Sequence, residues 1–149
     1  MNLIRWGFVA ALCLGAVAAH ASPLSPHGRA SERKVVTIRS DHGGMIVRYA
    51  LAKKKIEREK GLVRFLGRCD SACTLYLGLS SRQVCVGPHS AFGFHLPYGV
   101  ARREAAVARN YMLKSYPGWV RSWIRKNGGL TSSLKTMPYS YARRFIPEC

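Results

Sequence analysis

Ser71 and His95 are the residues of this 149-residue sequence whose types and surroundings best suit covalent chemistry. Ser71 stands in the stretch 67–74, between two apolar runs, and His95 ends the stretch 90–95. The pair Gly43-Gly44 lies upstream, at the end of another strand-like segment. A hydroxyl nucleophile, a base and a glycine turn whose N–H groups can face an oxyanion are the parts that acyl transfer requires.

The elements that must position these residues alternate between strands and helices. Runs of β-branched and apolar residues predict strands over 34–39, 62–66 (ended by Gly67), 82–86 and 91–95. Helical composition covers 45–60, 72–79, 100–116, 119–126 and, with a turn at Pro138, 132–144. This alternation predicts an α/β layer with parallel crossovers.

In such a layer Ser71 lies at a strand-to-helix junction, where backbone N–H groups are free and the helix dipole favours negative charge. We expect an oxyanion there to be held by the Ala72 N–H and by an N–H of the Gly43-Gly44 turn, because glycine permits a positive φ. His95, at the end of a neighbouring strand, could take the Ser71 proton and return it to the leaving group.

Each of these residues also has a purely structural interpretation. Ser71 could be the N-cap of its helix, which taken alone is the better reading. His95 could be a hydrogen-bonded histidine at a strand end, and Gly43-Gly44 an ordinary turn. Asp70 is interpreted as a charge that complements the helix dipole, and His42 and His89 as exposed turn residues. Because the spacing of the histidines resembles no zinc-site motif, we expect no metal, and we expect no cofactor.

The N-terminus has the features of a secretory signal peptide. Arg5 precedes an apolar stretch from Trp6 to Ala19, which is too short to span a bilayer. Ala19-His20-Ala21 is an A-x-A cleavage site, so residues 1–21 are assigned to the signal peptide. Residues 22–33 are interpreted as a flexible leader and 34–149 as one domain. We therefore expect export, to a bacterial periplasm.

The cysteines agree with export. Cys69, Cys73, Cys85 and Cys149 remain after removal of the signal peptide. Four cysteines in a small domain of an oxidising compartment indicate up to two disulfides, with three connectivities open. Zinc is disfavoured, because the cysteines lack the paired spacing of zinc sites.

A formal net charge of +17 favours anionic partners. Basic residues cluster along 48–60 and recur over 102–144, where Trp119, Trp123, Tyr139 and Tyr141 are interleaved. That mixture could bind an anionic envelope surface, although a solvated basic face and a core role for the tryptophans explain it equally simply. No nucleic-acid-binding motif accompanies the charge, so nucleic acid is not expected as a partner.

Taken together, Gly43-Gly44, the stretch from Gly67 to Ala72 and Phe94-His95-Leu96-Pro97 resemble the ClpP/crotonase superfamily. The resemblance is strongest to ClpP-type serine peptidases and to small exported bacterial ClpP-like proteins with a Cys-x-Ser-Ala-Cys-Thr stretch, and it covers roughly residues 35–125. It implies a fold of stacked ββα units, a peptide or protein substrate, Ser71 as nucleophile and His95 as general base. It also implies an oxyanion hole formed by the Gly44 and Ala72 N–H groups.

The sequence departs from this family at the acid that orients the base. ClpP-type peptidases carry an aspartate after the helix that follows the histidine, whereas Glu104 and Glu148 are the only acidic residues after His95. Three hypotheses remain open: a Ser71–His95 dyad, a triad completed by Glu148 through a disulfide of Cys149, or an inactive fold that binds an envelope component or a partner protein. The chain also lacks an early strand of the ClpP ring, which leaves the oligomeric state open.

Overall fold

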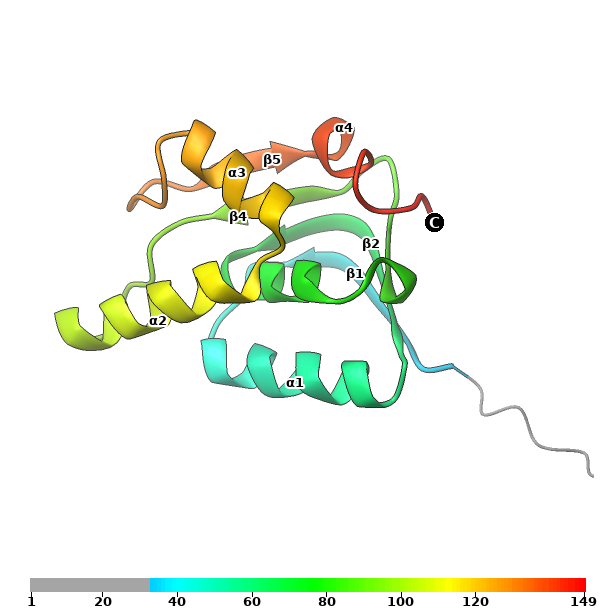
Figure 1. Cartoon of the computed structure of the whole chain (residues 1–149), viewed down its shortest axis with the longest axis horizontal. Coiled ribbons are helices and arrows are strands. Elements are labelled where there is room, and N and C mark those ends of the chain that lie inside the picture. Colours follow the sequence, from blue (N-terminus) through cyan, green and yellow to red (C-terminus); the bar gives the residue numbers. More distant parts are fainter. Residues whose placement is uncertain (1–32) are drawn as a thin grey trace, which may run out of the picture. The chain divides into compact units, whose positions relative to one another are not determined.

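Five strands form one mixed sheet in the computed structural model, which describes residues 33–149 (Figure 1). The strands are β1 (Val35–Asp41), β2 (Leu62–Asp70), β3 (Val84–Val86), β4 (Ala91–Phe94) and β5 (Lys135–Pro138). The helices are α1 (Ile46–Arg58), α2 (Arg102–Ser115), α3 (Gly118–Lys126) and α4 (Tyr139–Ala142), with 3-10 helices η1 (Ser71–Gly78) and η2 (Ser81–Gln83). The described residues are therefore an α/β domain, as predicted.

The strand β2 is the centre of the sheet. It pairs in parallel with β1 on one edge, and on the other edge with β3 near its start and with β4 near its end. The last strand, β5, joins β4 antiparallel. Because parallel neighbours need crossover connections, helices follow β1 and β2, and those connections carry the glycine turn and Ser71.

Two expectations about the elements were wrong, and a third was right in position but not in the type of helix. Gly67 does not end β2, which continues to Asp70. Leu66 and Gly67 form a bulge of β2 opposite Arg39 of β1, and glycine is required there because a Cβ at Gly67 would lie 1.8 Å from the Arg39 carbonyl oxygen. The helix expected over 72–79 is the 3-10 helix η1. Within 132–144, residues Lys135–Pro138 form the strand β5, because buried Met137 pairs with Phe92 of β4, and only α4 is helical.

The core lies where η1, α2 and α3 pack beside β2 and β4. Phe65 and Phe92 are fully buried and meet edge to face, with ring centroids 5.0 Å apart. Phe94 makes the same kind of contact with Tyr116, and the Tyr116 hydroxyl is within hydrogen-bonding distance of the buried Thr74 hydroxyl. These contacts hold the end of β4 against η1, and so fix the two elements that flank Ser71 and His95.

The four cysteines of the domain form two disulfides, Cys69–Cys73 and Cys85–Cys149. This settles the connectivity that the sequence left open, and it indicates an oxidising compartment. No helix within residues 33–149 is long and apolar enough to cross a membrane. The assigned signal peptide, residues 1–21, and the leader up to residue 32 lie outside the described residues.

Candidate active site

The parallel register brings Ser71 and His95 to the same edge of the sheet. Asp70, the last residue of β2, pairs with Gly93 of β4. Ser71 follows Asp70 directly, and His95 follows the last residue of β4, Phe94. The carboxyl ends of adjacent parallel strands are the usual position of a site in an α/β sheet.

The backbone at Ser71 is strained. Its φ is +54°, one of two positive values among the non-glycine residues of 33–149. Such a conformation costs about 1–2 kcal/mol for an L-residue, and strain of this kind concentrates at functional sites. A serine on a sharp turn between a strand and a helix is also the geometry of the nucleophile elbow in serine hydrolases.

Two contacts hold this turn in place. The Cys69–Cys73 disulfide joins the end of β2 to η1 and encloses Ser71 between its two half-cystines, whose Cα atoms lie 5.4 Å apart. The Thr74 hydroxyl donates a hydrogen bond of 2.5 Å to the Ser71 carbonyl. Ser71 itself is partly exposed, whereas Ala72, Cys73 and Thr74 are buried. The serine is thus presented at the surface by a rigid, buried support.

The glycine turn packs directly on this junction. A Cβ at Gly43 would lie 2.8 Å from the Ala72 nitrogen and 2.8 Å from the Ser71 Cβ, so only glycine fits there, and its φ is +81°. The Gly43 N–H donates to Asp41 Oδ1 at 2.8 Å, and the Tyr49 hydroxyl donates to the same oxygen. Because the Gly43 N–H is used, the Gly44 N–H is the donor of the turn that could face an oxyanion beside the Ala72 N–H.

His95 is oriented by the backbone rather than by a carboxylate. Its Nδ1 lies 2.6 Å from the Leu96 carbonyl oxygen, which can only accept, so Nδ1 carries the proton and Nε2 of the neutral ring can accept one. The Leu96 N–H donates to the Thr131 carbonyl, which fixes this peptide. Among the described residues, the hydrogen bonds of His95 do not include one to the Ser71 hydroxyl.

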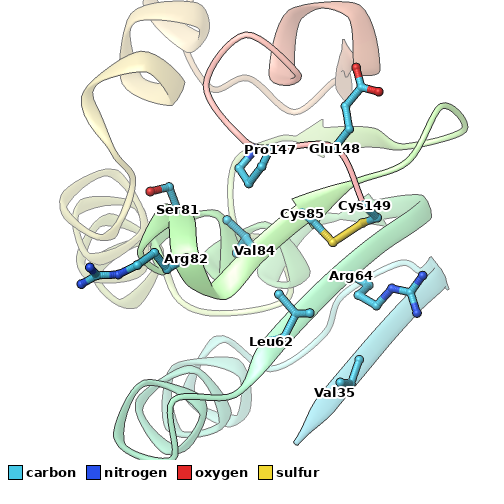
Figure 2. Close-up of a pocket in the computed structure, with 10 residues that line it drawn as sticks. All are labelled: Val35, Leu62, Arg64, Ser81, Arg82, Val84, Cys85, Pro147, Glu148 and Cys149. Atoms are coloured by element: carbon cyan, nitrogen blue, oxygen red, sulfur yellow. A yellow bond between two sulfur atoms is a disulfide. The ribbon is translucent and has the colours of Figure 1, made fainter. Parts of the chain in front are cut away.

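The structure does not bring Glu148 to His95. The Glu148 carboxylate pairs with Arg143 at 3.0 Å, and its backbone bridges Val86 of β3. Figure 2 shows this side chain pointing away from a shallow cavity of about 770 Å³ around the Cys85–Cys149 disulfide. That cavity is lined by Val35 and Leu62, the first residues of β1 and β2. It therefore lies at the amino ends of these strands, whereas Ser71 follows the carboxyl end of β2.

Asp70 has a different role from the one predicted, because it is buried and paired. Its side chain makes no cap hydrogen bond to η1. Instead, Oδ2 accepts from Arg68 Nε at 2.6 Å and lies 3.1 Å from His42 Nδ1. Oδ1 has no partner within residues 33–149 and is directed at Gly93, where a Cβ would come within 2.1 Å of it.

The Asp70–His42 contact ties the glycine turn to the residue before Ser71. His42 is exposed, as the sequence indicated, but its Nδ1 lies 3.1 Å from the carboxylate of Asp70, whose side chain is 6% exposed. Sequence reasoning missed this pair because 28 positions separate the two residues. The one available signal was an acidic residue at the end of a buried strand, where an unpaired charge is costly.

A second cavity, of about 290 Å³, opens at the glycine turn itself. It is lined by Gly43, Gly44, Arg48, Tyr49 and Tyr76, with Asp41, Met45 and Ala52. Burial, together with the hydrogen bond to Asp41 and its negative charge, raises the pKa of the Tyr49 hydroxyl. Arg48 forms no ion pair in the part of the chain that the structure describes. The cavity is large enough for a small group, and it presents one cation, Arg48, and one carboxylate, Asp41.

No group of three or more histidine, cysteine, aspartate or glutamate residues within 33–149 is arranged to hold a metal ion. The arrangement instead provides a strained serine, an oriented imidazole and two backbone N–H groups. Groups of these kinds can support nucleophilic catalysis.

Comparison with known proteins supports the fold alone. No family model and no curated protein matches the chain. One similar solved structure, described only as an enzyme, has a TM-score of 0.55 and 12% identity over 77% of this chain and 76% of that chain. Another, a peptidase from Plasmodium falciparum, has a TM-score of 0.54 and 13% identity over 79% of this chain and 78% of that chain. The domain thus shares its α/β architecture with an enzyme and with a peptidase.

Proposed function

We propose that this chain is an exported, ClpP-like serine hydrolase that cleaves peptides, with Ser71 as nucleophile and His95 as general base. The observation that carries the proposal is the elbow at Ser71. The serine has a positive φ, lies between β2 and η1, and is packed against a turn in which only glycine fits. The likeness to a peptidase fold agrees with this class of reaction.

The proposed reaction follows the order of serine peptidases. The Ser71 Oγ attacks the carbonyl carbon of the substrate while His95 Nε2 takes the hydroxyl proton. The Gly44 and Ala72 N–H groups donate to the oxygen of the tetrahedral intermediate, and a single donor of this kind is worth about 10²–10³ in rate. His95 then gives the proton to the leaving amine, and water hydrolyses the acyl group on Ser71.

The Leu96 carbonyl is the substitute for the missing carboxylate in this proposal. Its oxygen lies 2.6 Å from Nδ1 and accepts the Nδ1 hydrogen bond, which keeps the tautomer that the reaction needs. A carbonyl stabilises the imidazolium less than a carboxylate does, since it carries no full charge. We therefore expect a dyad that reacts more slowly than a complete triad.

Export follows from the assigned signal peptide, residues 1–21, and agrees with the two disulfides.

The test is covalent labelling of the purified protein with a fluorophosphonate, followed by intact mass. We expect one adduct on the wild type, none on Ser71→Ala and at least about a hundredfold slower labelling of His95→Ala, within the range of general-base catalysis. Ser140→Ala, on an exposed serine of α4, is the matched control and should label like the wild type. An adduct that persists in Ser71→Ala would contradict the proposal.

A second candidate function is binding without catalysis on the same fold. The observation that favours it is that both acidic residues after His95 lie elsewhere: Glu148 pairs with Arg143, and Glu104 lies in the first turn of α2. The partner would be an anionic envelope component or another protein. If the wild type stays unlabelled while its circular dichroism is that of a folded domain, this candidate replaces the hydrolase.

A further inference from the structure

An apolar groove separates the helices α1 and α2, which lie side by side in Figure 1. Its volume is about 560 Å³, within the usual range of ligand-binding pockets. Val47, Leu51 and Lys54 line the α1 wall, and Arg103, Val107 and Tyr111 line the α2 wall. Residues on each wall follow one another at about one turn, so the groove runs along both helices.

Several apolar side chains on the walls of the groove are largely exposed to solvent. Val47, Leu51 and Val107 are 64%, 62% and 66% exposed. The helix α1 buries Ile56 elsewhere, with Tyr49 and Ala52 packed against the core. No residue of 102–111 is buried, so the first ten residues of α2 have little packing of their own. A helix that depends on packing for its stability is expected to gain from a partner there.

Positive charge surrounds this apolar surface. The helix α1 carries five basic residues and one acidic residue, and α2 carries four basic residues and one acidic residue. Lys53 and Lys55 pair with Glu57 and Glu59. Lys54 and Arg103, on the two walls, form no ion pair within residues 33–149. The groove thus combines an apolar lining with two cations that form no ion pair within residues 33–149 and one carboxylate, that of Glu104.

We propose that this groove binds an acidic, amphipathic helical segment of a partner polypeptide. Such a segment inserts apolar side chains at positions i, i+3, i+4 and i+7 between two helices, as in other helix-in-groove complexes. Its acidic residues would lie beside Lys54 and Arg103. The groove is separate from Ser71, so the proposal stands whether or not the serine is reactive.

Other occupants fit these observations less well. A second copy of the chain would bring the same excess of cations on α1 and α2 against the groove, and like charges oppose such contacts. A lipid surface is flat, whereas Val47 and Leu51 lie across a groove from Val107 and Tyr111. The concave shape and the positive charge together favour a narrow, negatively charged, partly apolar ligand.

The test uses labelled synthetic peptides and fluorescence anisotropy with the purified protein. The acidic probe is an 18-residue helix, about five turns, with leucine at i, i+3, i+4 and i+7 and glutamate elsewhere on its surface. The same helix with lysine in place of glutamate tests the charge, and a scrambled acidic peptide tests the apolar spacing. Vesicles of phosphatidylglycerol and phosphatidylcholine test the lipid surface. We expect saturable binding of the acidic helix alone.

Variants then locate the site. Leu51→Gln with Val107→Gln should weaken binding of the acidic helix at least about tenfold, as expected for loss of apolar anchors. Lys54→Glu with Arg103→Glu should weaken it and flatten its salt dependence. The matched controls are Val35→Gln and Arg125→Glu, both exposed and outside the groove.

The controls should bind like the wild type, with thermal unfolding and circular dichroism checked for every variant. The proposal is overturned if the lysine or scrambled helix binds as tightly as the acidic one, or if none binds. It is also overturned if the groove variants bind unchanged, or if vesicles alone bind through these residues.

Discussion

A disulfide lies at each end of the sheet. One links residues that are close in the sequence, and the other links residues that are far apart. At the carboxyl end of β2, Cys69–Cys73 spans four positions and encloses Ser71. At the other end, Cys85–Cys149 spans 64 positions and fastens the C-terminus to β3. A long loop gains more from closure than a short one, so the second bond serves the stability of the domain. The first constrains one turn, which is the turn that a nucleophile would need.

The two ends of the sheet also differ in how their acidic residues are placed. At the site end, Asp70 is buried and bonded to Arg68 and His42. At the other end, Glu148 is exposed and pairs with exposed Arg143. Buried charges must be compensated, whereas exposed pairs contribute little. The site end is therefore held by short, buried contacts, and the far end by one long connection.

The largest effect on the labelling of Ser71 should come from adding a side chain where the glycine turn packs against Ser71. Gly43→Ala places a Cβ within 2.8 Å of three atoms of the Ser71 junction and strains a positive φ. We expect labelling of Ser71 to fall at least about a hundredfold, since the turn that carries an oxyanion donor must move. Gly129→Ala is the control: its φ is also positive, but nothing lies within 4 Å of its Cβ. Equal losses in both variants would show that the contact is unimportant.

Removing the Cys85–Cys149 disulfide should lower the stability of the domain without changing the reactivity of Ser71. For Cys85→Ala with Cys149→Ala we expect a loss of about 4 kcal/mol in the free energy of unfolding, measured in urea. The labelling rate of the folded fraction should stay that of the wild type. A slower rate at full folding would contradict the separation of the two ends.

Asp70→Asn should lower stability by about 2–3 kcal/mol, because two hydrogen bonds to a charged, buried group are weakened. Its matched control at the far end is Glu148→Gln, where loss of an exposed pair should cost under about 1 kcal/mol. Thermal unfolding of both variants gives the comparison. Similar losses would mean that burial of Asp70 does not make its contacts stronger.

Removal of the short disulfide should lower stability less than removal of the long one. Cys69→Ala with Cys73→Ala should cost about 2 kcal/mol, since few residues are enclosed. Labelling of Ser71 should nevertheless slow at least about tenfold, because a strained turn relaxes when its support is cut. The measurement is the labelling rate under conditions in which the variant is fully folded. A rate equal to that of the long-disulfide variant would show that the short bond is not specific to the site.

Local patterns predicted much of the fold. The β-branched runs and the turn at Gly43-Gly44 marked β1 and the start of α1 close to where they lie. The strand β5 was missed because Lys135–Pro138 has no strong strand pattern, and its conformation depends on pairing with β4. The 3-10 form of η1 was missed for a related reason: its residues are apolar and buried on all sides, so packing decides its geometry.

The residue types of the candidate site and their order can be read from the sequence, since Ser71, His95 and the glycine pair stand at recognisable element ends. The fold of the whole chain set their surroundings. It paired Asp70 with His42, directed the Nδ1–H of His95 to the Leu96 carbonyl oxygen, and packed Gly43 against Ala72. It also placed Glu148 with Arg143 and left a groove between α1 and α2. Local composition fixes which segment becomes a strand or a helix, whereas contacts between distant segments depend on how the whole chain packs.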